Sequence, residues 1–171
     1  NWQSVIVCIM TQLNWKLKPD ILERQAELEI ARKETKNGID LYQKLIELCI
    51  KHNCDPKKSR TIAGIQFKIG CAYSLLETGY QCALDYFYSA SKILTQLLVE
   101  DINLTSPTTP ITSDSLNSKS TLEGIEVCSD KSKELKAILL EIQNKIEECT
   151  IAIQERPLLE NERKREEQSN G

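Results

Sequence analysis

Two apolar stripes separated by a short polar break, over residues 63–94, constrain the fold of this chain more than any other part of its sequence. On both sides of the break Glu77-Thr78-Gly79, apolar residues recur at steps of three or four, the spacing of an amphipathic helix with one buried face. The first stripe holds Ile62, Ile65, Ile69, Tyr73 and Leu76, and the second holds Tyr80, Ala83, Leu84, Phe87, Ala90 and Leu94. The pattern predicts two helices that face each other across a short turn.

Small residues in both stripes indicate that these helices pack closely. Gly70 lies in the middle of the first helix, where glycine costs about 1 kcal/mol relative to alanine, so we expect another backbone to come close at this point. Ala83 and Ala90 allow the same close approach from the second helix.

This arrangement resembles the tetratricopeptide repeat, in which a large apolar residue precedes a glycine, an aromatic residue follows, and the second helix carries a small, an aromatic and a small residue. The matching residues are Ile69, Gly70, Tyr73, Ala83, Phe87 and Ala90. The turn between Gly70 and Ala83 is slightly longer than in that repeat, and Gln66 stands where tryptophan is common. The alternative is a pair of ordinary packed helices without repeat ancestry.

The segment before this hairpin predicts a degenerate repeat of the same kind. Lys18-Pro19-Asp20 is typical of a helix start, and Lys36-Asn37-Gly38 is typical of a helix stop. A single long helix kinked at Gly38 is the alternative. Asp55 and Pro56 then indicate the cap and the first residue of the next helix.

Composition changes abruptly after residue 98. Ten of the 17 residues from Thr105 to Thr121 are Ser or Thr, and such a segment buries too little apolar surface to offset its ordering entropy. Apolar residues at helical steps resume at Asp130, and Pro157 marks the end of that helix or a kink in it. The expected organisation is an undecided segment over 1–17, tetratricopeptide-like helical repeats over 18–100, a disordered insert over 101–129, a capping helix over 130–156 and a polar tail over 157–171.

The last repeat and the helix after the insert together resemble the nuclear autoantigenic sperm protein family of histone chaperones. The resemblance rests on Gly70-Cys71-Ala72-Tyr73 and on the leucine, isoleucine and glutamate pattern of residues 134–148. It covers roughly 63–148 without the insert and, more weakly, 26–49. It implies an all-α fold in which tetratricopeptide-repeat hairpins end in a long capping helix. This sequence lacks the acidic tract and the first repeat of that family.

A partner-binding groove is predicted on the first helix of the central hairpin. In stacked repeats the first helix of each pair lines a concave groove, so Gly64, Phe67, Cys71 and Ser74 should face a bound peptide. This groove is apolar and lacks the lysine and asparagine that clamp the terminal carboxylates of heat-shock chaperones. The resembled family places a carboxylate three residues before the aromatic, where this chain has Gly64.

The resemblance implies a histone chaperone module that binds histones 3 and 4, with linker histone as a further candidate, and supports histone supply and chromatin assembly. It implies a nuclear and also cytoplasmic location, and self-association stays open. The alternative function is a general tetratricopeptide-repeat scaffold for protein interactions.

Composition argues against several other classes. A net charge of -3 gives no basic surface for nucleic acid, and the apolar run 5–10 is too short to span a membrane. With one histidine and no glycine-rich phosphate loop, we expect no enzyme and no cofactor. The seven cysteines are interpreted as reduced, buried small hydrophobes. Cys49, His52 and Cys54 lack a fourth ligand nearby, so no metal site is expected.

Overall fold

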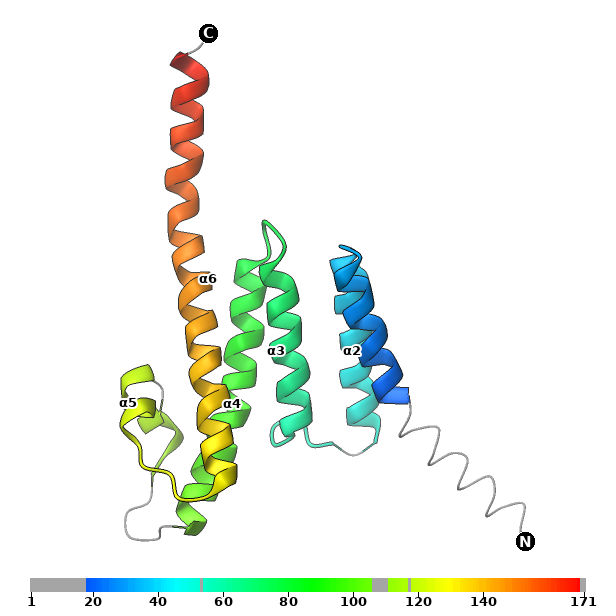
Figure 1. Ribbon diagram of the computed structural model, residues 1–171, viewed down its shortest axis with the longest axis vertical. Coiled ribbons are helices and arrows are strands. Elements are labelled where there is room, and N and C mark those ends of the chain that lie inside the picture. Colours follow the sequence, from blue (N-terminus) through cyan, green and yellow to red (C-terminus); the bar gives the residue numbers. More distant parts are fainter. Residues whose placement is uncertain (1–17, 53, 106–110, 117, 170–171) are drawn as a thin grey trace, which may run out of the picture. The chain divides into compact units, whose positions relative to one another are not determined.

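The computed structural model describes residues 18–52, 54–105, 111–116 and 118–169 (Figure 1). Regular structure in these residues is entirely helical, which confirms the predicted all-α class for this part of the chain. The chain divides into two compact units, Asn1–Pro56 and Lys57–Gly171. The undecided segment 1–17 lies outside the described residues.

The first unit contains a helical hairpin. A helix over residues 18–31 is followed by a tight turn, in which Lys33 has a φ of 68°, and by α2 (Thr35–Lys51). The alternative of one long kinked helix is therefore wrong, and the predicted stop at Lys36-Asn37-Gly38 is wrong as well, because these residues form the start of α2. The core of this hairpin consists of Ala26, Ile39, Tyr42, Leu45 and Cys49.

Gly38 has a packing role in this hairpin. A Cβ atom at Gly38 would lie 2.5 Å from Cγ1 of Ile30 and 2.9 Å from the carbonyl oxygen of Ala26. Because no larger residue fits there, Gly38 lets α2 approach the preceding helix closely.

The second unit is built on the predicted hairpin of α3 (Arg60–Ser74) and α4 (Tyr80–Thr105). The cap of α3 is Ser59, whose hydroxyl accepts a hydrogen bond from the amide of Ile62 at 3.3 Å. The prediction that Asp55 caps this helix and Pro56 begins it is wrong, because both residues precede Ser59 outside the helix.

The short turn between the two helices depends on Gly79. A Cβ atom there would overlap the carbonyl oxygen of Tyr73, and the carbonyl of Gly79 accepts the first helical bond of α4, from Ala83 N at 2.9 Å. Near this turn Tyr73 stacks on Tyr86, with ring centroids 5.6 Å apart. The predicted break at 77–79 is confirmed.

Gly70 permits close packing, but its neighbour is a ring. A Cβ atom at Gly70 would lie 2.6 Å from Cε1 and 2.7 Å from Cδ1 of Phe87, which is fully buried on α4. The expectation that a second backbone comes close here is wrong. The absence of a side chain at Gly70 instead makes room for the ring of Phe87.

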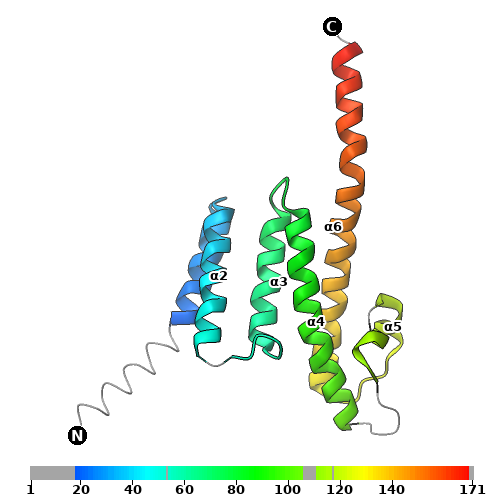
Figure 2. The same cartoon turned by 180° about the vertical axis from the view of Figure 1, so that it is seen from behind.

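A long helix, α6 (Asp130–Ser169), packs along α4 (Figures 1 and 2). Its buried residues are Ser132, Leu135, Leu139, Ile142, Ile146 and Cys149. In both views α6 continues beyond the turn between α3 and α4. The helix predicted over 130–156 is thus longer than expected. It passes through Pro157, and the sequence that follows is rich in Glu, Arg and Lys, which are good helix formers.

The start of α6 is tied to α4 by one carboxylate. Ser129 caps α6 by accepting a hydrogen bond from Ser132 N at 2.9 Å. The hydroxyls of Ser129 and Ser132 both donate to Oδ2 of Asp101 at 2.5 Å, and Lys131 Nζ lies 3.4 Å from Oδ1. These donors, led by Ser129, hold the pKa of Asp101 below its ordinary value. Asp101 therefore joins the last turns of α4 to the first turn of α6.

The expected disordered insert is largely ordered in the described residues. Residues 101–105 complete α4, and a strap, defined here as residues 111–116 and 118–129, contains η1 (Ser113–Leu116) and α5 (Lys119–Gly124). Leu116 and Leu122 are each only 1% exposed. Residues 106–110 lie outside the described part.

Hydrogen bonds from side chains of α4 and α6 hold the polar strap in place. Ser118 caps α5, and Lys136 of α6 donates to the carbonyls of Glu123 at 3.0 Å and Ile125 at 2.7 Å. Asn103 binds both the amide and the carbonyl of Ile111. In the described residues of this region, Ser118 caps α5 and Ser129 caps α6, so these two serines stabilise helix starts.

Candidate functional site

The four predicted groove residues lie along one continuous helix, α3, but they differ in their surroundings. Gly64 is exposed, and nothing lies within 4 Å of the place where its Cβ would be. Phe67, one turn further, is half-buried and packs on Phe87, with ring centroids 5.6 Å apart and a tilt of 47°. Gly64 and Phe67 thus form the open part of the predicted groove.

Phe67 rests on a rigid support. Phe87 is fully buried and is seated against Gly70, so it cannot withdraw without opening the core between α3 and α4. A half-exposed aromatic ring held in place in this way loses little side-chain entropy when a partner covers it.

The other two residues are engaged within the second unit. Burial raises the pKa of the Cys71 thiol, and the positive charge of Lys145 on α6 lowers it. Three further groups of α6 raise the same pKa: Glu141, Cys149 and Glu148. Cys71 therefore borders α6. The hydroxyl of Ser74 donates to the carbonyl of Cys71 at 2.7 Å, so it serves its own helix.

A row of glutamates on α6 flanks this face of α3, and sequence reasoning missed it. Four exposed glutamates follow one another at intervals of seven residues, which keeps them on nearly the same side of the helix: Glu134, Glu141, Glu148 and Glu155. Their spacing in the sequence was the available signal. We call these four residues the glutamate row.

One ion pair and two electrostatic effects place Glu134, Glu141 and Glu148 on the side of α6 toward α3. Glu134 Oε2 pairs with Arg60 Nη2 at 2.9 Å, and Glu141 and Glu148 both act on Cys71. Glu148 also pairs with Lys145 at 2.7 Å and thereby raises the pKa of that amine. The row thus gives the open face around Phe67 an acidic neighbour.

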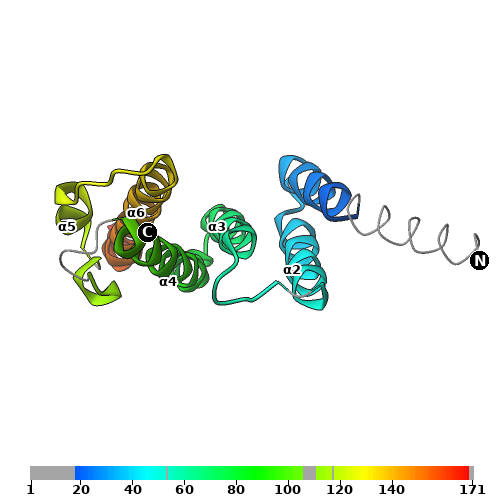
Figure 3. The same ribbon diagram turned by 90° about the horizontal axis from the view of Figure 1, so that it is seen from below.

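The strap leaves this face uncovered. Seen from behind and from below, α5 lies on the side of α4 and α6 that is away from α3 (Figures 2 and 3). The strap therefore completes the opposite side of the second unit, where Leu116 and Leu122 are buried.

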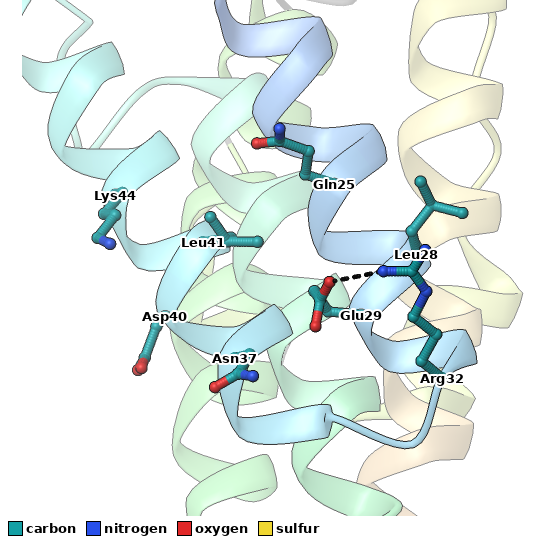
Figure 4. Close-up of a pocket in the computed structure, with 8 residues that line it drawn as sticks. All are labelled: Gln25, Leu28, Glu29, Arg32, Asn37, Asp40, Leu41 and Lys44. Atoms are coloured by element: carbon teal, nitrogen blue, oxygen red, sulfur yellow. Dashed lines mark hydrogen bonds and ion pairs between the residues drawn. The ribbon is translucent and has the colours of Figure 1, made fainter.

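The first unit carries a hollow of about 490 Å³ between the helix over residues 18–31 and α2 (Figure 4). It is lined by Gln25, Leu28, Glu29, Arg32, Asn37, Asp40, Leu41 and Lys44. Glu29 already pairs with Arg32 at 3.3 Å, and the remaining charges, Asp40 and Lys44, are of opposite sign. This mixture contains no nucleophile beside a base, so it has no evident catalytic arrangement.

Within the described ranges, no group of three His, Cys, Asp or Glu side chains is arranged to hold a metal ion. His52 is exposed at the end of α2, between the buried Cys49 and the half-buried Cys54. Among the described residues, no helix is both long enough and apolar enough to cross a membrane.

Comparisons of this chain with protein-family models, with curated proteins and with solved structures give no match.

Proposed function

We propose that this chain is a histone chaperone module that binds histones 3 and 4 through the face of α3 around Phe67. It would support histone supply and chromatin assembly, in the nucleus and also in the cytoplasm, with linker histone as a further candidate partner. In this proposal α3 and α4 are a tetratricopeptide repeat and α6 is its capping helix. The sequence resemblance over 63–148 supports the identity of the partner.

The observation that carries the proposal is the position of Phe67. It is a half-buried aromatic residue on a fixed support, one turn from the open site at Gly64 and one turn from Cys71, on which Glu141 and Glu148 act. Aromatic residues in such settings supply a large share of binding energy in protein interfaces, while surrounding charges contribute mainly to association rate and specificity.

Charge alone would not produce a selective interaction. The net charge is -3, and interactions between exposed charges weaken over about 8 Å at physiological salt. Glu134 and Glu148 already pair with Arg60 and Lys145, so Glu141 and Glu155 are the members of the glutamate row that can orient a basic helix or extended segment whose apolar residues cover Phe67.

Gly64 supports the alternative function. It stands where the resembled family carries a histone-contacting carboxylate, and so the face lacks one expected polar contact. A general scaffold that binds amphipathic segments through Phe67 would need no such carboxylate.

A binding titration with the purified complex of histones 3 and 4 separates these functions. Phe67→Ala should weaken binding about tenfold or more at low and at physiological salt, because the apolar anchor is lost. Tyr88→Ala is the matched control, since Tyr88 is a 55% exposed aromatic on α4 and should leave affinity unchanged. Gly64→Glu should strengthen binding, and there is open space for the longer side chain.

An unrelated basic protein of similar charge serves as the competing ligand. Selective binding of the histones is the expected result. Equal binding of both proteins, with affinity that disappears at physiological salt and does not depend on Phe67, would exclude the chaperone function. If Phe67→Ala abolishes binding of both the histones and the unrelated basic protein, the general scaffold is favoured.

A further inference from the structure

The C-terminal end of α2 brings two cysteines together. The amide of Cys54 donates a hydrogen bond to the carbonyl of Cys49 at 3.1 Å, so the bond encloses residues 49–54. This bond holds the backbones of Cys49 and Cys54 next to each other at the end of α2, so their side chains start from neighbouring positions.

The side chains agree with this geometry. Neither thiol is in a disulfide in this structure, and Cys54 is close enough to act on the titration of Cys49. Cys49 is only 5% exposed, whereas Cys54 is half-buried and so can be reached from solvent. Burial raises the pKa of Cys49, and Cys54 and Glu23 raise it further. A reagent in solution therefore reaches the Cys54 thiol first, and the buried Cys49 thiol beside it reacts in the second step.

We propose that Cys49 and Cys54 form a thiol–disulfide exchange site that takes a small disulfide such as oxidised glutathione as co-reactant. The Cys54 thiolate attacks one sulfur of oxidised glutathione, and one glutathione thiolate leaves and takes up a proton. The Cys49 thiolate then attacks the Cys54 sulfur of the mixed disulfide and releases the second glutathione. Two protein thiols are oxidised to one disulfide, and one oxidised glutathione is reduced to two thiols.

The location suggests what the bond would do. The boundary between the two compact units falls after Pro56, two residues beyond Cys54. A disulfide between Cys49 and Cys54 would fix the direction in which the chain leaves α2 and thereby restrain the connection to the second unit. This site is separate from the face around Phe67, so it does not depend on the proposed histone binding.

The test is to incubate the full chain with oxidised glutathione, block the remaining thiols and digest with trypsin. Lys51 lies between the two cysteines, so cleavage separates them into peptides 45–51 and 52–57. The expected product is these two peptides joined by a disulfide, with the loss of two hydrogen masses, and they should come apart after reduction. Cys82, which is exposed, should carry only glutathione adducts.

Single variants check the order of the steps. In Cys49→Ser, a glutathione adduct should accumulate on Cys54, because the resolving thiol is gone. In Cys54→Ser, Cys49 should stay reduced, because it is buried. A stable glutathione adduct on Cys54 of the unmodified chain with Cys49 still reduced, or a disulfide from either residue to another cysteine, would overturn the proposal.

Discussion

At the scale of single residues, three positions determine the shape of the proposed binding face around Phe67. Gly70 makes room for Phe87, Phe87 supports Phe67, and Gly64 leaves the adjacent surface open. The two glycines have opposite roles, because one is filled by a neighbouring ring and the other has no neighbour within 4 Å. A change at Gly70 should therefore act on stability, and a change at Gly64 should act on binding.

Gly70→Leu should lower the free energy of unfolding by roughly 1–3 kcal/mol or more, since its side chain would overlap the buried ring of Phe87. Gly64→Ala is the control and should raise stability by about 0.5–1 kcal/mol, because alanine favours the helix at an open position. Urea unfolding followed by circular dichroism measures both. An unchanged midpoint for Gly70→Leu would mean that the ring of Phe87 does not occupy this space.

At the scale of elements, the second unit depends on how α6 is fixed to α4. Among the α6 residues whose side chains the structure describes, five apolar ones are buried, and Asp101 holds the first turn of α6 through two serine hydroxyls. The buried apolar residues contribute most of the stability, whereas the Asp101 carboxylate fixes the first turn of α6, which Ser129 caps, against α4.

Ile142→Asp should detach α6 from α4. Ile142 is fully buried, and an unpaired carboxylate there should cost about 2 kcal/mol or more. Asn144→Asp adds the same group at an exposed position of α6 and serves as the control. Limited proteolysis should cut Ile142→Asp within α6 while the control stays resistant. If both variants resist equally, α6 does not depend on these buried apolar residues.

Asp101→Asn should destabilise the fold by about 1 kcal/mol at neutral pH, because two hydroxyls and Lys131 lose a charged partner. The pKa of Asp101 is lower in the folded chain than in the unfolded one, where the pKa of an aspartate is about 3.9. Its contribution is therefore complete above that pH and is lost as the pH falls through the lower folded value.

Melting temperatures at neutral and at acidic pH test this prediction. The difference between the unmodified chain and Asp101→Asn should shrink below a pH of about 4. Asp85→Asn, an exposed position on α4, should show little difference at either pH. A difference for Asp101→Asn that stays constant with pH would show that the charge of Asp101 is not what holds α6.

Apolar periodicity predicted α3, α4 and α6 because their buried residues repeat at helical steps. It did not predict the strap, whose burial depends on only two leucines and on polar caps such as Ser118. Gly38 was misread as a stop because the sequence does not show that Ile30 lies against it. Gly64 and Phe67 were predicted as one open face with Cys71, but the position of α6 beside Cys71 is a tertiary contact that a helical pattern does not contain.

At the scale of the whole molecule, the described chain combines two helical units, and each carries one candidate site. The first unit ends in the cysteine pair at 49 and 54, and the second unit carries Phe67 and the glutamate row. Because the row is built from exposed residues, its contribution to binding should be modest and sensitive to salt.

Glu141→Gln should weaken histone binding by less than about fivefold, and the effect should decrease at higher salt. Glu126→Gln, an exposed change in the strap, should leave the affinity unchanged. Isothermal titration at two salt concentrations measures both variants. Equal effects of the two changes would mean that general charge, and not the row, attracts the partner.

The central claim is that histones 3 and 4 lie on the face of α3 around Phe67, and site-specific photocrosslinking tests it most directly. A photoreactive phenylalanine derivative placed at position 64, where there is open space, should crosslink histone 3 or histone 4 in the assembled complex. The same group at position 88 on α4 should crosslink neither. Crosslinking from position 88 with none from position 64 would contradict the account, because the histones would then be bound by a different face.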